Sequence, residues 1–107
     1  MKWTALGNTS ELSQKNMSAV NIAGHKLLVI FSDNKFYCFR DRCSHQDIPL
    51  SSFGQIGSFE GQDSLTCFAH GAVFALNSGN RIAGPECSSL ESFPIKDQAG
   101  ILYAELP

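Results

Sequence analysis

Apolar and β-branched residues occur along this chain in short runs separated by turn residues, a pattern typical of antiparallel β-structure. The clearest part is residues 17–40. Its apolar runs are residues 19–23, 26–31 and 36–39, and the turn signals between them are Gly24-His25 and Asp33-Asn34. Gly and Asn tolerate the left-handed backbone that tight hairpin turns require. We therefore predict a three-stranded antiparallel meander over residues 17–40.

The other apolar runs are also short. Further candidate strands are 2–6 at an edge, 64–67, 73–76, 92–96 and 101–106. Helix is indicated only at residues 10–15, where Ser10 would cap a single turn. Residues 41–61 are rich in Ser, Gly, Pro and Asp and are predicted to form a loop, and loops of this length in small domains are usually functional. The pattern predicts an all-β domain whose middle is built from loops.

Composition narrows the class of protein. With 107 residues, 43% of them hydrophobic and 17% charged, one globular domain is expected. The formal net charge of −2 leaves no basic surplus for nucleic acid. The longest apolar run, Leu27–Phe31, is too short to cross a bilayer. The start, Met1–Thr4, lacks the apolar stretch of a signal peptide, so we expect a soluble cytoplasmic protein with reduced thiols.

Two short clusters each combine one cysteine with one histidine. They are Cys43-Ser44-His45 and, after 21 intervening residues, Cys67-Phe68-Ala69-His70. Two thiolates and two imidazoles suit a soft or borderline metal. Zinc fingers pair Cys with Cys and His with His. A Rieske [2Fe–2S] centre instead replaces two Cys by two His on one of its irons, and one ligand of each type in each loop produces that division.

With these clusters the sequence resembles the Rieske-type ferredoxins of bacterial oxygenase systems. The likeness continues in Gln46–Leu50, Phe74–Leu76, Gly84-Pro85 and Phe93–Ile95. It implies a Rieske fold, in which an antiparallel β-sandwich base (residues 1–41 and 87–107) carries an inserted cluster-binding subdomain (residues 42–86).

The resemblance also implies the cofactor and its ligands. One Rieske-type [2Fe–2S] cluster would be bound by Cys43 and Cys67 on an inner iron and by His45 and His70 on an outer iron near the surface. The loop around Gly84-Pro85 would cover it. The chain is expected to be a monomeric electron carrier, not an enzyme by itself. It would take one electron from a flavin-dependent reductase and pass it to a terminal oxygenase.

Two other functions remain open at this point. The chain could be the small Rieske subunit of a nitrite-reductase-like complex, which would copurify with a larger subunit. It could also be a zinc-stabilised binding module, which would be colourless where a Rieske protein is red-brown.

Two finer expectations concern the surroundings of the cluster. High-potential Rieske proteins resemble this chain after the second His but carry Ser and Tyr hydroxyls where Ala72 and Phe74 stand here. Hydrogen bonds to cluster sulfur favour the reduced state, so we expect a potential at the low end of the range, roughly −150 mV. A docking patch is predicted at the loop tips. Its apolar residues are Ile48, Pro49, Leu50 and Ala69.

Several residues are given structural interpretations. Cys38 is predicted to be a buried small hydrophobe and Cys87 a structural thiol. His25 is predicted to be solvated in a turn, and Trp3 to lie in the core. The segment 58–63, between the two ligand pairs, is longer than expected for bacterial ferredoxins of this type.

Overall fold

The computed structural model describes residues 2–42, 48–69, 71–84 and 88–107. The chain forms two compact units, which we call the base unit (Met1–Arg40 with Ser92–Pro107) and the second unit (Asp41–Glu91). Antiparallel strands dominate both units, which confirms the all-β prediction. The described helices have four residues each, so none of them is long enough to span a membrane.

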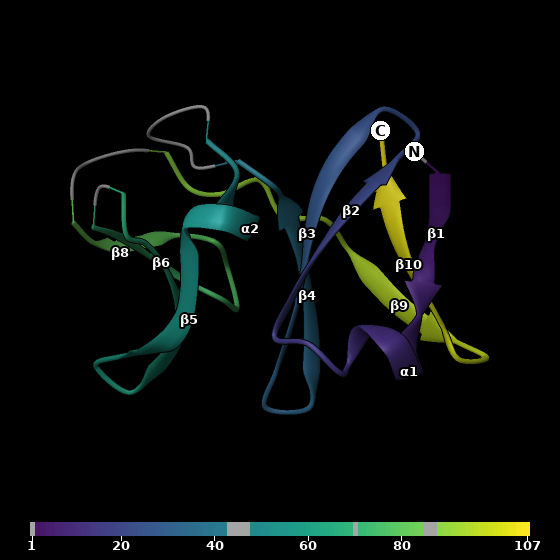
Figure 1. The fold of residues 1–107 in the computed structure, drawn as a ribbon, viewed down its shortest axis with the longest axis horizontal. Coiled ribbons are helices and arrows are strands. Elements are labelled where there is room, and N and C mark those ends of the chain that lie inside the picture. The colour runs from purple at the N-terminus through teal and green to yellow at the C-terminus, as the bar shows by residue number, and fades with distance from the viewer. Residues whose placement is uncertain (1, 43–47, 70, 85–87) are drawn as a thin grey trace. The chain divides into compact units, whose positions relative to one another are not determined.

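The base unit contains two three-stranded antiparallel sheets (Figure 1). One has the order β1-β10-β9, and its strands are β1 (Lys2–Asn8), β10 (Ile101–Leu106) and β9 (Ile95–Gln98). The other is the predicted meander, with strands β2 (Met17–Ile22), β3 (His25–Ser32) and β4 (Lys35–Arg40). Asp33 and Asn34 both have positive φ, as the tight turn between β3 and β4 requires.

The core of the base unit lies between these two sheets. Alternate residues of β3 and β4 face the apolar side of β1 and β10, as expected for strands with a period of two. The buried cluster consists of Leu6, Leu27, Val29, Cys38, Phe93, Leu102, Ala104 and Leu106. Cys38 is therefore a buried small hydrophobe, as predicted, and it is a free thiol. Burial raises the pKa of this thiol from 9.0 to about 12, against the lowering effect of Arg40.

Two predicted elements of the base unit have different ends in the structure. The helical turn is α1 (Thr9–Leu12), and its cap is Asn8 instead of Ser10. The Asn8 side-chain oxygen accepts a hydrogen bond from the Ser10 amide. The strand predicted at 92–96 begins only at Ile95. Before it, Ser92 forms a single isolated bridge with Phe39 and does not belong to a continuous strand.

Two side chains of the base unit were predicted wrongly. Trp3 is 41% exposed, and the Lys96 ammonium lies 4.4 Å from the centre of its ring. Trp3 lies on the edge strand β1, where its ring contacts the Lys96 ammonium without entering the core. His25 begins β3 and is half-buried, with its Nδ1 3.3 Å from the Arg40 guanidinium.

The second unit is one antiparallel sheet preceded by a short helix. Its elements are α2 (Leu50–Phe53), β5 (Gly54–Phe59), β6 (Gln62–Cys67), β7 (Ala72–Ala75) and β8 (Arg81–Ala83), with the strands in sequence order. The prediction of a loop over 41–61 is thus wrong for α2 and β5. The long segment 58–63 is the end of the β5–β6 hairpin, where Glu60 and Gly61 both have positive φ.

Candidate metal centre

Cys67 is the predicted ligand whose position the structure describes. It is fully buried and ends β6, between Gly54 of β5 and Ala72 of β7. The other predicted ligands, Cys43, His45 and His70, lie outside the described residues, as does Cys87. Among the residues that are described, no three His, Cys, Asp or Glu side chains gather closely enough to hold a metal ion.

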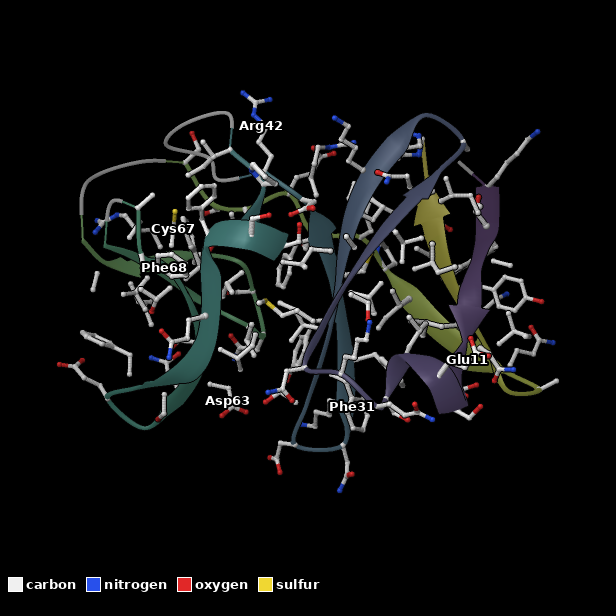
Figure 2. All side chains as sticks on the ribbon, in the orientation of Figure 1. Glu11, Phe31, Arg42, Asp63, Cys67 and Phe68 are labelled. Atoms are coloured by element: carbon white, nitrogen blue, oxygen red, sulfur yellow. The ribbon has the colours of Figure 1, made fainter. Side chains whose placement is uncertain are left out.

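The chain turns sharply directly after Cys67. The Gly71 amide donates a hydrogen bond to the Cys67 carbonyl at 2.7 Å, which closes a one-turn loop around the second ligand pair. The Phe68 amide donates to the Phe53 carbonyl at 2.9 Å and so ties this loop to the end of α2. Figure 2 shows Cys67 and Phe68 next to each other close to α2. The sheet and these two hydrogen bonds thus fix the backbone at Cys67.

The first predicted ligand pair is flanked by residues that contact each other. Asp41 precedes the pair, and its carboxylate accepts hydrogen bonds from the amide and the hydroxyl of Ser51 in α2. Leu50 begins α2 and is fully buried. Its place in the predicted docking patch is therefore wrong, because the helix turns this side chain inward. Pro49 and Ala69 are exposed and Ile48 is half-exposed, as that patch requires.

An aromatic pair, Phe53 and Phe68, is exposed beside Cys67. The rings are 38% and 57% exposed, and their centres lie 6.0 Å apart in a tilted arrangement. Neither residue was predicted from the sequence to be functional. The exposure of Phe68 could have been predicted from its place between Cys67 and His70, because a side chain inside a short ligand loop has no strand partner to cover it.

Gly84 brings the loop after β8 against the second ligand loop. A Cβ added to Gly84 would lie 2.7 Å from the Ala72 Cα and would also collide with the Gly71 carbonyl. The φ of Gly84 is +86°, a conformation that favours glycine. Arg81 holds the same turn by donating to the Gly84 carbonyl at 3.2 Å. Backbone from two loops therefore meets close to Cys67, in a place where no side chain fits.

The residues after the second ligand loop are apolar and buried. Ala72 and Phe74 are fully buried in β7, and Ala72 is the direct cross-strand partner of Cys67. Neither side chain has a hydroxyl that could donate a hydrogen bond to sulfur. The surroundings of Cys67 on β7 are therefore apolar.

These features fit a bound iron–sulfur cluster. A buried cysteine ends a strand, a closed turn follows it, and glycine backbone packs over that turn. The other predicted ligands, Cys43, His45 and His70, would add one thiolate and two imidazoles, which completes the donor set of a Rieske centre.

Comparisons with known proteins agree with this fit. A family model described as the Rieske [2Fe-2S] domain matches residues 2–94. The biphenyl 2,3-dioxygenase ferredoxin component of Rhodococcus jostii (strain RHA1) is 29% identical over 106 residues, which cover 99% of this chain and 94% of that protein. The 3-phenylpropionate/cinnamic acid dioxygenase ferredoxin subunit of Escherichia coli O9:H4 (strain HS) is 28% identical over 90 residues, covering 83% and 81%.

Solved structures share the fold at lower identity. A putative nitrite reductase NADPH small subunit superimposes with a TM-score of 0.82 at 17% identity, over 99% of this chain and 100% of that one. The terminal oxygenase of carbazole 1,9a-dioxygenase from Novosphingobium sp. KA1 gives a TM-score of 0.80 at 19% identity, over 95% of this chain but only 29% of the oxygenase. With the family match over most of its length, this chain belongs to the Rieske [2Fe–2S] domain family, and its cofactor is a Rieske-type [2Fe–2S] cluster.

Proposed function

We propose that this chain is an electron-transfer protein that carries one electron between a flavin-dependent reductase and a terminal oxygenase. The observation that carries the proposal is the family match over residues 2–94 combined with the buried Cys67 at a closed turn. Relatives named as ferredoxin components of dioxygenase systems support the same role. A cytoplasmic location and a monomeric state remain predictions.

The proposed ligands are Cys43, His45, Cys67 and His70. The two thiolates would bind one iron and the two imidazoles the other, and residues 42–86 would form the cluster-binding subdomain. The bound cluster supplies the one-electron redox step. The chain's own contribution is to hold the ligands, to keep Cys67 away from water and to offer a surface for docking.

The aromatic pair Phe53 and Phe68 is proposed as the centre of the docking surface, in place of Leu50. Phe68 adjoins Cys67 in the chain, and more than half of its side chain is open to solvent. Exposed aromatic side chains are enriched where proteins bind each other. Electron carriers bind and release their partners quickly, and their interfaces are small. A patch of two rings with Pro49 and Ala69 suits such a weak contact.

The acceptor in this proposal is a terminal oxygenase. Solved structures of a complex between oxygenase and ferredoxin in carbazole 1,9a-dioxygenase are among those with this fold. The nitrite-reductase-like alternative predicts instead that the chain copurifies with a larger subunit. The zinc-stabilised binding module does not agree with the Rieske family match.

The test uses purified protein together with a flavin-dependent reductase and a terminal oxygenase. We expect red-brown protein containing iron and labile sulfide, reduction by the flavoprotein, and reoxidation on mixing with the oxygenase. His45→Ala and His70→Ala are expected to remove the native spectrum. His25→Ala is the matched control, because His25 lies in the base unit beside Arg40 and is not a proposed ligand. Protein without iron, or unchanged spectra in both ligand variants, would contradict the proposal.

A further inference from the structure

A pair of short hydrogen bonds joins the two sides of the first ligand segment. The Asp41 Oδ1 atom accepts from the Ser51 amide at 2.7 Å, and its Oδ2 atom accepts from the Ser51 hydroxyl at 2.6 Å. Both residues are half-buried. We call this pair of contacts the carboxylate bracket; it closes a segment whose ends are ten residues apart in the chain.

The bracket replaces the local cap that α2 lacks. Pro49 stands at the N-cap position and makes no side-chain hydrogen bond to the helix. Helix amides in the first turn need an outside acceptor. Asp41 provides it for Ser51 from the far side of the ligand segment. Its carboxylate therefore stabilises α2 and fixes the start of the segment in one step.

The helix that receives the bracket is itself attached to the strand end that carries Cys67. The Phe53 carbonyl at the end of α2 accepts from the Phe68 amide. Leu50 is fully buried, and Gly54 lies so close to the Leu50 carbonyl that an added Cβ would be 2.6 Å from its oxygen. A continuous set of contacts thus runs from Asp41 through α2 to the residue after Cys67.

We propose that the carboxylate bracket is a positioning device that holds the segment carrying Cys43 and His45 in place relative to Cys67. The proposal rests on the proposed ligand set. Tying the ends of a short segment removes conformations that the free loop would otherwise sample. Ligands held within a narrow range of positions bind their group more tightly and in one geometry. Asp41 and Ser51 would then act on the cluster through the ligands, without touching it.

The test compares four variants as cluster-loaded proteins. Asp41→Ala removes both contacts, and Ser51→Ala removes the hydroxyl contact alone. Asp41→Asn is the rescue, because an amide offers an oxygen to the Ser51 N–H and an N–H to the Ser51 hydroxyl. Asp63→Ala is the control for charge. Asp63 is an exposed acid of the same unit, and Figure 2 shows it toward the other end of β6 from Cys67.

Two readouts report on positioning: the rate at which an iron chelator removes iron, and the electron paramagnetic resonance spectrum of the reduced protein. We expect Asp41→Ala to release iron at least about tenfold faster and to broaden the spectrum, as ligand-supporting contacts do when lost. Ser51→Ala should lie between Asp41→Ala and wild type. Asp41→Asn should stay close to wild type, and Asp63→Ala should match it.

The outcomes separate three explanations. If Asp41→Ala releases iron at the wild-type rate with an unchanged spectrum, the positioning role is wrong. If Asp63→Ala has the same effect as Asp41→Ala, or if Asp41→Asn is as impaired as Asp41→Ala, charge and not geometry is responsible, and the proposal is also wrong. Should Asp41→Ala not fold, Ser51→Ala decides by the same two readouts. A wild-type protein that contains no cluster would instead refute the proposed function.

Discussion

The close approach of Gly84 to the second ligand loop can be tested by adding a single carbon atom. In Gly84→Ala the new Cβ would lie 2.7 Å from the Ala72 Cα and 2.9 Å from the Gly71 carbonyl carbon. Carbon atoms in contact normally stay 3.5–4.0 Å apart, so backbone must move. Gly61→Ala is the matched control. Gly61 has a φ of +83°, close to the +86° of Gly84, but nothing lies within 4 Å of its added Cβ.

The two substitutions share one cost and differ in another. Placing an alanine at positive φ costs roughly 1 kcal/mol, and this applies to both. Forcing an extra methyl group into packed structure costs about 1–3 kcal/mol more, and this applies to Gly84 alone. For a domain near 100 residues, 1 kcal/mol lowers Tm by about 4 °C or more. We therefore expect Gly61→Ala to melt about 4 °C below wild type and Gly84→Ala a further ~4–12 °C lower.

The assay is thermal unfolding of the cluster-loaded proteins at one scan rate, followed by circular dichroism and by the visible absorption of the cluster. Using one scan rate matters because loss of a cofactor makes unfolding irreversible. Equal melting temperatures for the two variants would show that the loop after β8 does not pack against Gly71 and Ala72. A selective loss of visible absorption in Gly84→Ala would support the proposal that this loop covers the cluster.

Three further predictions concern docking, potential and stability. Phe68→Ala should lower the rate constant for electron transfer to the oxygenase roughly fivefold to thirtyfold, which corresponds to about 1–2 kcal/mol of lost contact, with Tm almost unchanged. Trp3→Ala, at another exposed aromatic residue, is the control, and equal slowing by both variants would argue against a docking role for Phe68. Ala72→Ser places a hydroxyl across from Cys67, and a hydrogen bond from it to sulfur would favour the reduced state by about 1 kcal/mol. We therefore expect the reduction potential to rise by roughly 40 mV from a starting value of roughly −150 mV. A lower potential in protein-film voltammetry would contradict this. Because the pKa of Cys38 is raised from 9.0 to about 12, its neutral thiol stabilises the fold fully below pH 9 and this stability is lost as the pH rises toward 12. The difference in unfolding free energy between wild type and Cys38→Ala should therefore shrink over that pH range in urea titrations, and a constant difference would contradict the assigned burial.

The meander of the base unit could be predicted because two local signals agree there. Apolar runs such as Leu27–Phe31 mark strands, and Asp33 and Asn34 tolerate the positive φ of the turn. β5 could not be predicted in the same way. Its sequence contains two glycines and little apolar alternation, and it becomes a strand because its backbone pairs with β6 along its whole length. Tertiary pairing here overrides local preference.

The exposure of individual side chains was harder to predict than the positions of the strands in the meander. Leu50 follows Pro49 and precedes two serines, so the local sequence indicates a loop tip. The short helix α2 turns Leu50 inward, while Phe53 at its other end remains exposed. The spacing of Cys and His, in contrast, predicts the chemistry directly, because ligand type and order do not depend on how the intervening residues fold.

In the proposed ligand set, two histidines bind one iron of the cluster while two cysteines bind the other. Electron spin echo envelope modulation of the reduced protein, prepared with ¹⁵N-labelled histidine, tests it most directly. We predict that the nitrogen couplings change to those of ¹⁵N and that they correspond to two directly bound imidazoles. A reduced cluster whose spectrum shows no histidine nitrogen coupling would contradict the account.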